Sequence, residues 1–125
     1  MHYVIVAVGG GIGAALRYGV NVGSGQLIGG DYPWHTLIVN VVGCFAMGAI
    51  TEMAALKFNF SNEMRLFLTT GILGGFTTFS AFALDFALMA ERRDYLMAGG
   101  YVLASVVLSL AACFAGLGAV RSILA

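Results

Sequence analysis

The amino-acid sequence predicts an all-α integral membrane protein with four transmembrane helices in a single domain over residues 1–125. Hydrophobic residues make up 60% of the chain and charged residues 10%, whereas an average soluble domain is about half apolar and about a quarter charged. The mean hydropathy is +0.93. The charges separate four long uncharged stretches, and about 20 apolar residues cross a hydrocarbon core of about 30 Å. Four such spans with short loops use the whole chain.

The same composition argues against several other classes of protein. Six basic and six acidic residues are too few to cover a soluble globule of this size. A net charge of zero argues against nucleic-acid binding, which needs a basic surface. The first apolar run has no basic segment before it, so we expect no cleavable signal peptide. Two isolated cysteines and two isolated histidines match no zinc or redox motif, and we expect the thiols to be free, buried and hydrophobic in character: Cys44, Cys113, His2, His35.

Each span has a boundary signal. The uncharged stretch 1–16 in the first span is followed by Arg17, the first charge in the chain, and Pro33 stands where it can open the second span. Ser61 is a candidate N-cap for the third span, and Arg121 follows the last uncharged stretch. We therefore expect helices at about 3–22, 34–55, 65–90 and 95–120.

The basic residues are balanced between the two faces of the membrane. Four spans place three on each side: Lys57, Arg65 and Arg121 on one, and Arg17, Arg92 and Arg93 on the other. Orientation in the membrane follows the bias in lysine and arginine. Because this chain has no bias, the sequence indicates dual topology.

Glycines are frequent, with 18 in the chain. Three pairs are spaced as G-x-x-x-G, which lets membrane helices approach closely: Gly9 with Gly13, Gly19 with Gly23, and Gly71 with Gly75. A lone four-helix unit leaves little room for a polar route, so we expect a homo-oligomer, most simply a dimer.

The first of these pairs also imitates a dinucleotide-binding fingerprint. Gly9, Gly11 and Ala14 follow an apolar run, and Asp31 lies at a tolerable distance. That motif needs a strand, a turn and a helix within a βαβ sheet. The rest of the sequence predicts no alternating strands, so close helix packing is the preferred interpretation.

Polar residues inside the spans are candidates for function, because they are costly in a bilayer. In the third span, Gly74 and Gly75 precede Thr77, Thr78 and Ser80. This run is typical of a helix broken near mid-membrane, whose freed carbonyls are good ligands for a hard cation. The alternative is an unbroken helix that packs through its glycines.

Two further patterns allow a functional and a packing interpretation. Asn40 in the second span can donate to an anion or make an interhelical hydrogen bond, and Thr36 lies one turn earlier on its face. Phe79 and Phe82 are three residues apart and form either a core pair or two positive ring edges that meet a desolvated anion.

The last span carries a polar stripe. Tyr101, Ser105 and Ser109 follow one another at intervals of four residues and therefore share a helix face. Such a face lines a pore in one interpretation. In the other, the serines bond their own backbone.

At these residues the sequence resembles the Fluc (CrcB) family of microbial fluoride channels over essentially the whole chain. The matching segments are GGGIGAALRY with Arg17, TLIVNVVG with Asn40, and TTGILGGFTTFSAF in the third span. The resemblance implies a passive, fluoride-selective channel in the cell (inner) membrane that exports cytoplasmic fluoride. It further implies an antiparallel, dual-topology homodimer with two pores and a central structural Na⁺.

Carried onto this sequence, the resemblance also implies the roles of individual residues. Arg17 would attract anions or fix the end of the first helix near the membrane edge. Backbone carbonyls of Gly74 and Thr77 would bind Na⁺. The pore would be lined by Phe79, Phe82, Asn40, Ser80, Ser105, Ser109 and Tyr101. The sequence departs from the family at Ala81, Asp85 and His35.

Two other functions remain as alternatives. A small dual-topology multidrug cation exporter shares the size and charge balance, but it needs a mid-membrane carboxylate, which spans one, two and four lack. A membrane assembly subunit would use the glycines for packing alone. We expect no enzyme, because no nucleophile and base are paired in the sequence.

Overall fold

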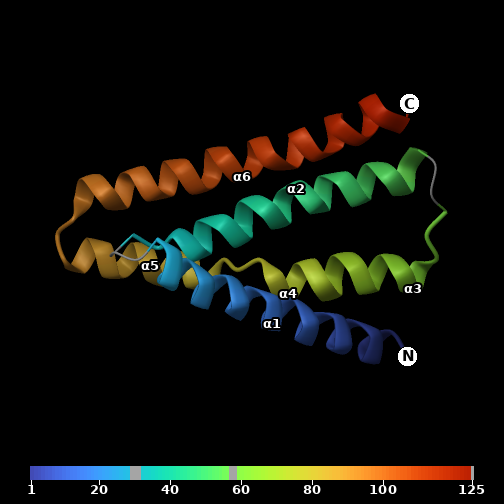
Figure 1. The fold of residues 1–125 in the computed structure, drawn as a ribbon, viewed down its shortest axis with the longest axis horizontal. Coiled ribbons are helices and arrows are strands. Elements are labelled where there is room, and N and C mark those ends of the chain that lie inside the picture. Colours follow the sequence, from blue (N-terminus) through green and yellow to red (C-terminus); the bar gives the residue numbers. More distant parts are fainter. Residues whose placement is uncertain (29–31, 57–58, 125) are drawn as a thin grey trace.

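The structure, a computed structural model, describes residues 1–28, 32–56 and 59–124. These residues form helices joined by short connections, and none of them belongs to a β-strand. Figure 1 shows the chain running back and forth along one long axis. In chain order the elements are α1 (His2–Leu27), α2 (Trp34–Leu56), α3 (Asn62–Arg65), the π-helix η1 (Leu66–Leu73), α4 (Gly74–Phe76), α5 (Ser80–Glu91) and α6 (Tyr95–Leu124).

Local sequence explains where several helices begin. The predicted N-cap at Ser61 is confirmed, because its Oγ accepts a hydrogen bond of 3.1 Å from the backbone N–H of Met64. Helix α2 begins directly after Pro33, whose carbonyl accepts from the N–H of Leu37. Between α5 and α6 the chain reverses through Arg93, which has a positive φ of 63°.

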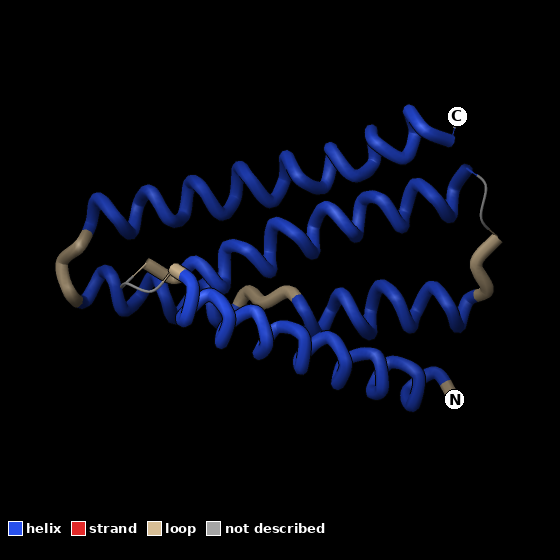
Figure 2. The backbone as a smooth tube through the Cα atoms, in the orientation of Figure 1, coloured by secondary structure: helices blue, strands red, loops and turns tan. Residues whose placement is uncertain are grey.

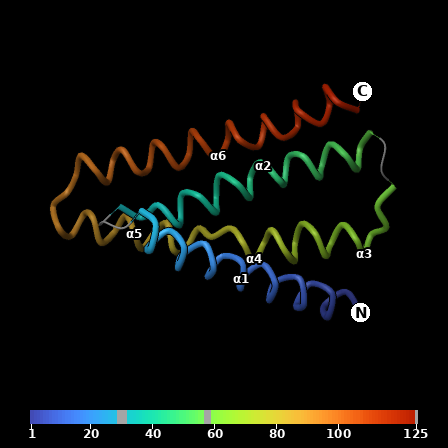
Figure 3. The backbone as a smooth tube through the Cα atoms, in the orientation of Figure 1, coloured from blue at the N-terminus to red at the C-terminus, as the bar shows by residue number. Residues whose placement is uncertain are grey.

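The helices pack as two pairs. Helix α2 runs beside α6, and α1 crosses η1 and α4, as the backbone traces in Figures 1 and 3 show. Helix α5 contacts α6 and so links the two pairs. At one end an ion pair fastens α2 to α6, with Arg121 Nη2 3.0 Å from Glu52 Oε2. Glu52 is only 8% exposed, so the acidic partner of this ion pair is buried.

Two of the three predicted glycine pairs lie where helices cross. A Cβ added at Gly9 would stand 2.9 Å from the Cα of Gly71, and one at Gly13 would stand 2.8 Å from the backbone nitrogen of Phe76. The backbones of α1 and of the third segment therefore touch with no side chain between them. At Gly19 and Gly23 such a Cβ would meet nothing within 4 Å among the described residues outside the nearby backbone of α1 itself, so this pair makes no close approach to another described helix.

Four helical segments of the described chain are long and apolar enough to cross a membrane. They are His2–Leu27, Trp34–Leu56, Asn62–Glu91 and Tyr95–Leu124, and between 11% and 28% of their most apolar windows is buried inside the chain. Large apolar side chains such as Leu96 and Phe114 are mostly exposed. The apolar surface of the bundle therefore faces lipid or another protein.

The first helix is longer than the sequence predicts. It continues to Leu27, because the polar residues after Arg17 do not stop it. Arg17 therefore lies well inside α1, and the expectation that it fixes the helix end is wrong. Two residues used in the sequence analysis, Asp31 and Lys57, lie outside the described residues.

The third segment is not a continuous α-helix. Its first part is wound as the π-helix η1, and residues 77–79 lie outside any helix. Figure 2 shows this stretch as a loop between two helical pieces. Thr77 has extended backbone angles, with φ −83° and ψ 158°. The polar run after the paired glycines thus interrupts the helical hydrogen bonds.

Candidate functional site

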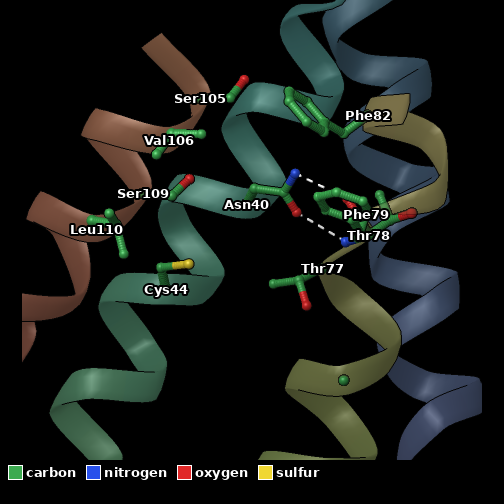
Figure 4. A pocket seen from close by; sticks show the side chains of 11 residues that line it. Asn40, Cys44, Thr77, Thr78, Phe79, Phe82, Ser105, Val106, Ser109 and Leu110 are labelled. Carbon is green, nitrogen blue, oxygen red and sulfur yellow. Dashed lines mark hydrogen bonds between the residues drawn. The ribbon is translucent and has the colours of Figure 1, made fainter. Parts of the chain in front are cut away.

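A pocket of about 500 Å³ opens beside the interruption in the third segment. Figure 4 shows its side chains coming from α2, α6 and the third segment. Among the described residues its wall carries no charged side chain. It is lined by Asn40, Cys44, Gly74, Thr77, Thr78, Phe79, Phe82, Ser105, Val106, Ser109 and Leu110. Seven residues that the sequence singled out therefore meet here: Asn40, Gly74, Thr77, Phe79, Phe82, Ser105 and Ser109.

Asn40 holds the interrupted segment against α2. Its Oδ1 accepts from the backbone N–H of Thr78 at 2.8 Å, and its Nδ2 donates to the carbonyl of Thr78 at 3.0 Å. Of the two sequence interpretations, the interhelical hydrogen bond is therefore present. An amide nitrogen carries two hydrogens. One Nδ2 hydrogen therefore has no partner among the described residues and is available to a ligand.

Two backbone N–H groups near the interruption are diverted to side chains. In an unbroken α-helix the N–H of Thr78 would bind the carbonyl of Gly74, and the N–H of Ala81 would bind that of Thr77. Here Thr78 donates to Asn40, and Ala81 donates to Thr78 Oγ1 at 3.2 Å. The carbonyls of Gly74 and Thr77 thus lose their usual α-helical partners, so the donor chemistry at these two residues fits a hard cation.

The two phenylalanines differ in their surroundings. Phe79 is 78% exposed, and its ring centroid lies 5.5 Å from that of Phe82. Phe82 also packs against Tyr101, with centroids 5.2 Å apart. Phe82 is therefore anchored in the chain, whereas Phe79 projects from it.

The polar stripe of α6 divides into two parts. Ser105 and Ser109 line the pocket, and Ser105 Oγ is buried without a hydrogen-bond partner. Tyr101 is fully buried outside the pocket lining, and its hydroxyl donates to Asp85 Oδ2 at 3.1 Å. The same oxygen accepts from Thr36 Oγ1 at 2.7 Å. The sequence analysis gave Asp85 no partner.

The expected site residue Ser80 also lies outside the pocket lining. Its Oγ is 3.3 Å from Thr78 Oγ1, and either hydroxyl can donate. Because Thr78 in turn caps Ala81, this pair supports the start of α5.

Arg17 lines a second pocket of about 280 Å³, which shares Thr78 with the first pocket. Its Nε donates to the carbonyl of Gly75 at 3.1 Å. This bond ties α1 to the piece of the third segment just before the interruption. The pocket is lined by Ala14, Arg17, Tyr18, Asn21, His35, Thr36, Val39, Thr78 and Ala81.

Comparison with known proteins identifies a family. Residues 4–117 match the family described as "CrcB-like protein, Camphor Resistance (CrcB)". A relative from Rhizobium etli is 53% identical over 120 residues, which cover 96% of each chain. Relatives from Mesorhizobium japonicum and Agrobacterium fabrum are 52% and 50% identical, and the matches cover 98% of each chain. All three relatives are named "Fluoride-specific ion channel FluC", which describes a channel and not an enzyme.

Proposed function

Because this chain belongs to the CrcB family, we propose that it is a passive, fluoride-selective ion channel of the cell inner membrane that releases cytoplasmic fluoride. One observation carries the proposal. The pocket beside the interrupted segment combines an amide, hydroxyls and aromatic rings, and no charged side chain lines it among the described residues. A path with few charges can bind an anion weakly enough for the anion to leave again, which conduction requires.

The donors in the pocket suit a small, strongly hydrated anion. Ser105 Oγ is buried and has no hydrogen-bond partner, so its hydroxyl is available to replace a water of hydration. Asn40 has a second amide hydrogen on Nδ2, and the rings of Phe79 and Phe82 have positive edges.

We further propose that Na⁺ binds the carbonyls of Gly74 and Thr77. Support comes from the diverted N–H groups of Thr78 and Ala81. The ion would take the place of the N–H donors that these carbonyls have lost, and its role would be structural.

The functional unit in this proposal is an antiparallel, dual-topology homodimer with two pores. The exposed ring of Phe79 and the open side of the pocket would then face the partner. The multidrug-exporter alternative is disfavoured, because a carboxylate is absent from the described lining of the pocket.

The experiment is fluoride efflux from liposomes that contain the purified protein, followed with a fluoride electrode. Valinomycin carries compensating K⁺, and chloride-loaded liposomes run in parallel. We expect fast fluoride release with chloride retained. A folded protein that releases no fluoride would refute the channel function and leave the family fold alone.

A further inference from the structure

A pocket of about 260 Å³ lies at the end of the bundle where α2 finishes and the third segment begins. Figure 1 shows the N-terminus at this same end. The wall of the pocket combines apolar side chains of α2 with one cation and two hydroxyls, and it is lined by Ile50, Thr51, Ala54, Ala55, Arg65 and Thr69. It shares no lining residue with the pocket beside the interruption, so the proposed function leaves it unused.

The position of this pocket along the helices places it at one edge of the membrane. Arg65 lies in the first turn of the apolar span Asn62–Glu91. The start of α1 is at the same level, because His2 Nε2 is 3.8 Å from Glu63 Oε1. Tyr3 beside it is 92% exposed, and exposed tyrosine rings of spanning helices are typical of the membrane–water interface. Phospholipid headgroups lie just outside the hydrocarbon core, at this depth.

The positive charge of Arg65 is not neutralised by an acidic side chain of the described residues. Glu63 lies beside His2, and Glu52 is paired with Arg121. The described lining of the pocket contains no acidic residue. A guanidinium presents its N–H donors as a planar fork that matches the oxygens of a phosphate. The Arg65 side chain is exposed and can therefore offer this fork to an anion.

The two hydroxyls of the pocket differ in what they still can bind. Thr69 Oγ1 donates to the carbonyl of Arg65 at 2.7 Å, so its hydrogen is already used. Thr51 makes no such bond within the described part of the chain, and its hydroxyl can donate to a ligand. Because Thr51 belongs to α2 and Arg65 to α3, the two donors approach the pocket from different helices.

The apolar part of the wall distinguishes a lipid from a free anion. Ile50, Ala54 and Ala55 belong to the last turns of α2. They offer no hydrogen-bonding side chain, and a small inorganic anion gains nothing from them. The glycerol and the first acyl carbons of a phospholipid would instead bury apolar surface there.

We propose that this pocket binds the phosphate group of an anionic phospholipid. Arg65 would hold the phosphate oxygens, Thr51 would donate to one of them, and the apolar wall of α2 would receive the glycerol. Basic pockets between transmembrane helices bind anionic lipid headgroups in this way. In a zwitterionic lipid a cationic group stands beside the phosphate, so the attraction to Arg65 is weaker. The site needs no ion flux, and it is tested separately from the proposed function.

The test measures lipid binding to the purified protein in detergent. Native mass spectrometry follows the adducts formed with increasing phosphatidylglycerol or phosphatidylcholine. Arg65→Gln removes the charge. Arg92→Gln is the matched control, because Arg92 is also exposed but lies in the connection between α5 and α6 and does not line the pocket. The two free cysteines are partly exposed, contrary to the expectation that they are buried, so all samples are kept reduced to prevent disulfide-linked copies.

The expected result is a lipid preference that depends on Arg65. The unmodified protein and Arg92→Gln should bind phosphatidylglycerol about fivefold or more tightly than phosphatidylcholine, since hydrogen bonds to charged groups are the stronger ones. Arg65→Gln should lose this preference while unfolding at the same temperature as the control. Arg65→Lys and Thr51→Val should keep part of it. An equal preference in Arg65→Gln and Arg92→Gln would overturn the proposal.

Inorganic phosphate separates the two sources of the same chemical group. In large excess over the lipid it should leave the phosphatidylglycerol adduct intact, because it makes no use of the apolar wall. Displacement of the lipid by phosphate would overturn the assignment to a phospholipid. An unmodified protein without any preference for phosphatidylglycerol would overturn the site altogether, and that result is expected if a second copy of the chain covers the pocket.

Discussion

Both ends of the Asn40 amide are hydrogen bonded to the backbone of one residue, Thr78. The N–H of Thr78 reaches Oδ1 at 2.8 Å, and its carbonyl accepts from Nδ2 at 3.0 Å. The two residues are 38 positions apart. A single side chain of α2 thus replaces the helical partners that the backbone of Thr78 has lost.

Replacing Asn40 by leucine should destabilise the protein and abolish fluoride efflux. Both backbone groups of Thr78 would lose their partners, at a cost of about 1–3 kcal/mol for each group that stays buried. Asn40→Asp keeps an acceptor for the N–H and should unfold at an intermediate temperature. Thermal unfolding in detergent checks this order. An unchanged midpoint for Asn40→Leu would contradict the structural role.

Alanine at Gly13 should disrupt the packing of α1 on the third segment. Its Cβ would stand 2.8 Å from the backbone nitrogen of Phe76 and would clash with the carbonyl of Ile72. Gly11→Ala is the matched control, because nothing lies within 4 Å of a Cβ there. We expect a lower unfolding temperature for Gly13→Ala alone. Equal behaviour of the two variants would show that the helices do not cross at this glycine.

Isoleucine at Phe79 or Phe82 should lower fluoride efflux, because either change removes an aromatic ring edge from the pocket. The effects on stability should differ. Phe82 packs against Tyr101, whereas Phe79 is largely exposed within the chain. Efflux assays and unfolding curves on the same preparations measure both effects. Undiminished efflux in both variants would remove the phenylalanines from the pathway.

Removal of Na⁺ should impair fluoride efflux or the integrity of the dimer. The carbonyls of Gly74 and Thr77 lack their usual α-helical partners, and the proposed ion would satisfy them. The measurement compares sodium buffers with N-methylglucamine buffers at equal ionic strength, by efflux and by size-exclusion chromatography. A protein indifferent to this exchange would argue against the cation site.

We expect Tyr101→Phe and Thr36→Val to lower the rate of fluoride efflux to a similar extent. Both hydroxyls donate to the same oxygen, Asp85 Oδ2, so each variant removes one of its two donors. If these residues act through Asp85, the double variant should lose less than the sum of the two single losses. Additive losses would instead indicate that Tyr101 contacts the ion separately.

How far the sequence alone could go depends on the type of interaction. The four spans follow from hydropathy and charge spacing, and the cap at Ser61 follows from a local hydrogen bond to Met64. The glycine contacts were predictable at Gly9 and Gly13, because spacing alone puts small residues on one helix face. The same spacing at Gly19 and Gly23 corresponds to no close approach to another helix among the described residues, since spacing does not say what lies opposite.

The sequence by itself determined the apolar spans, the polar residues within them and the glycines beside the interruption. Only the tertiary structure decided which residues meet. It gave Asn40 its partner in Thr78, turned Tyr101 toward Asp85 and bonded Arg17 to the carbonyl of Gly75. The physical reason is that helix periodicity reports which face a residue occupies, whereas hydrogen bonds between helices depend on their crossing, and that is fixed by contacts distant in the sequence.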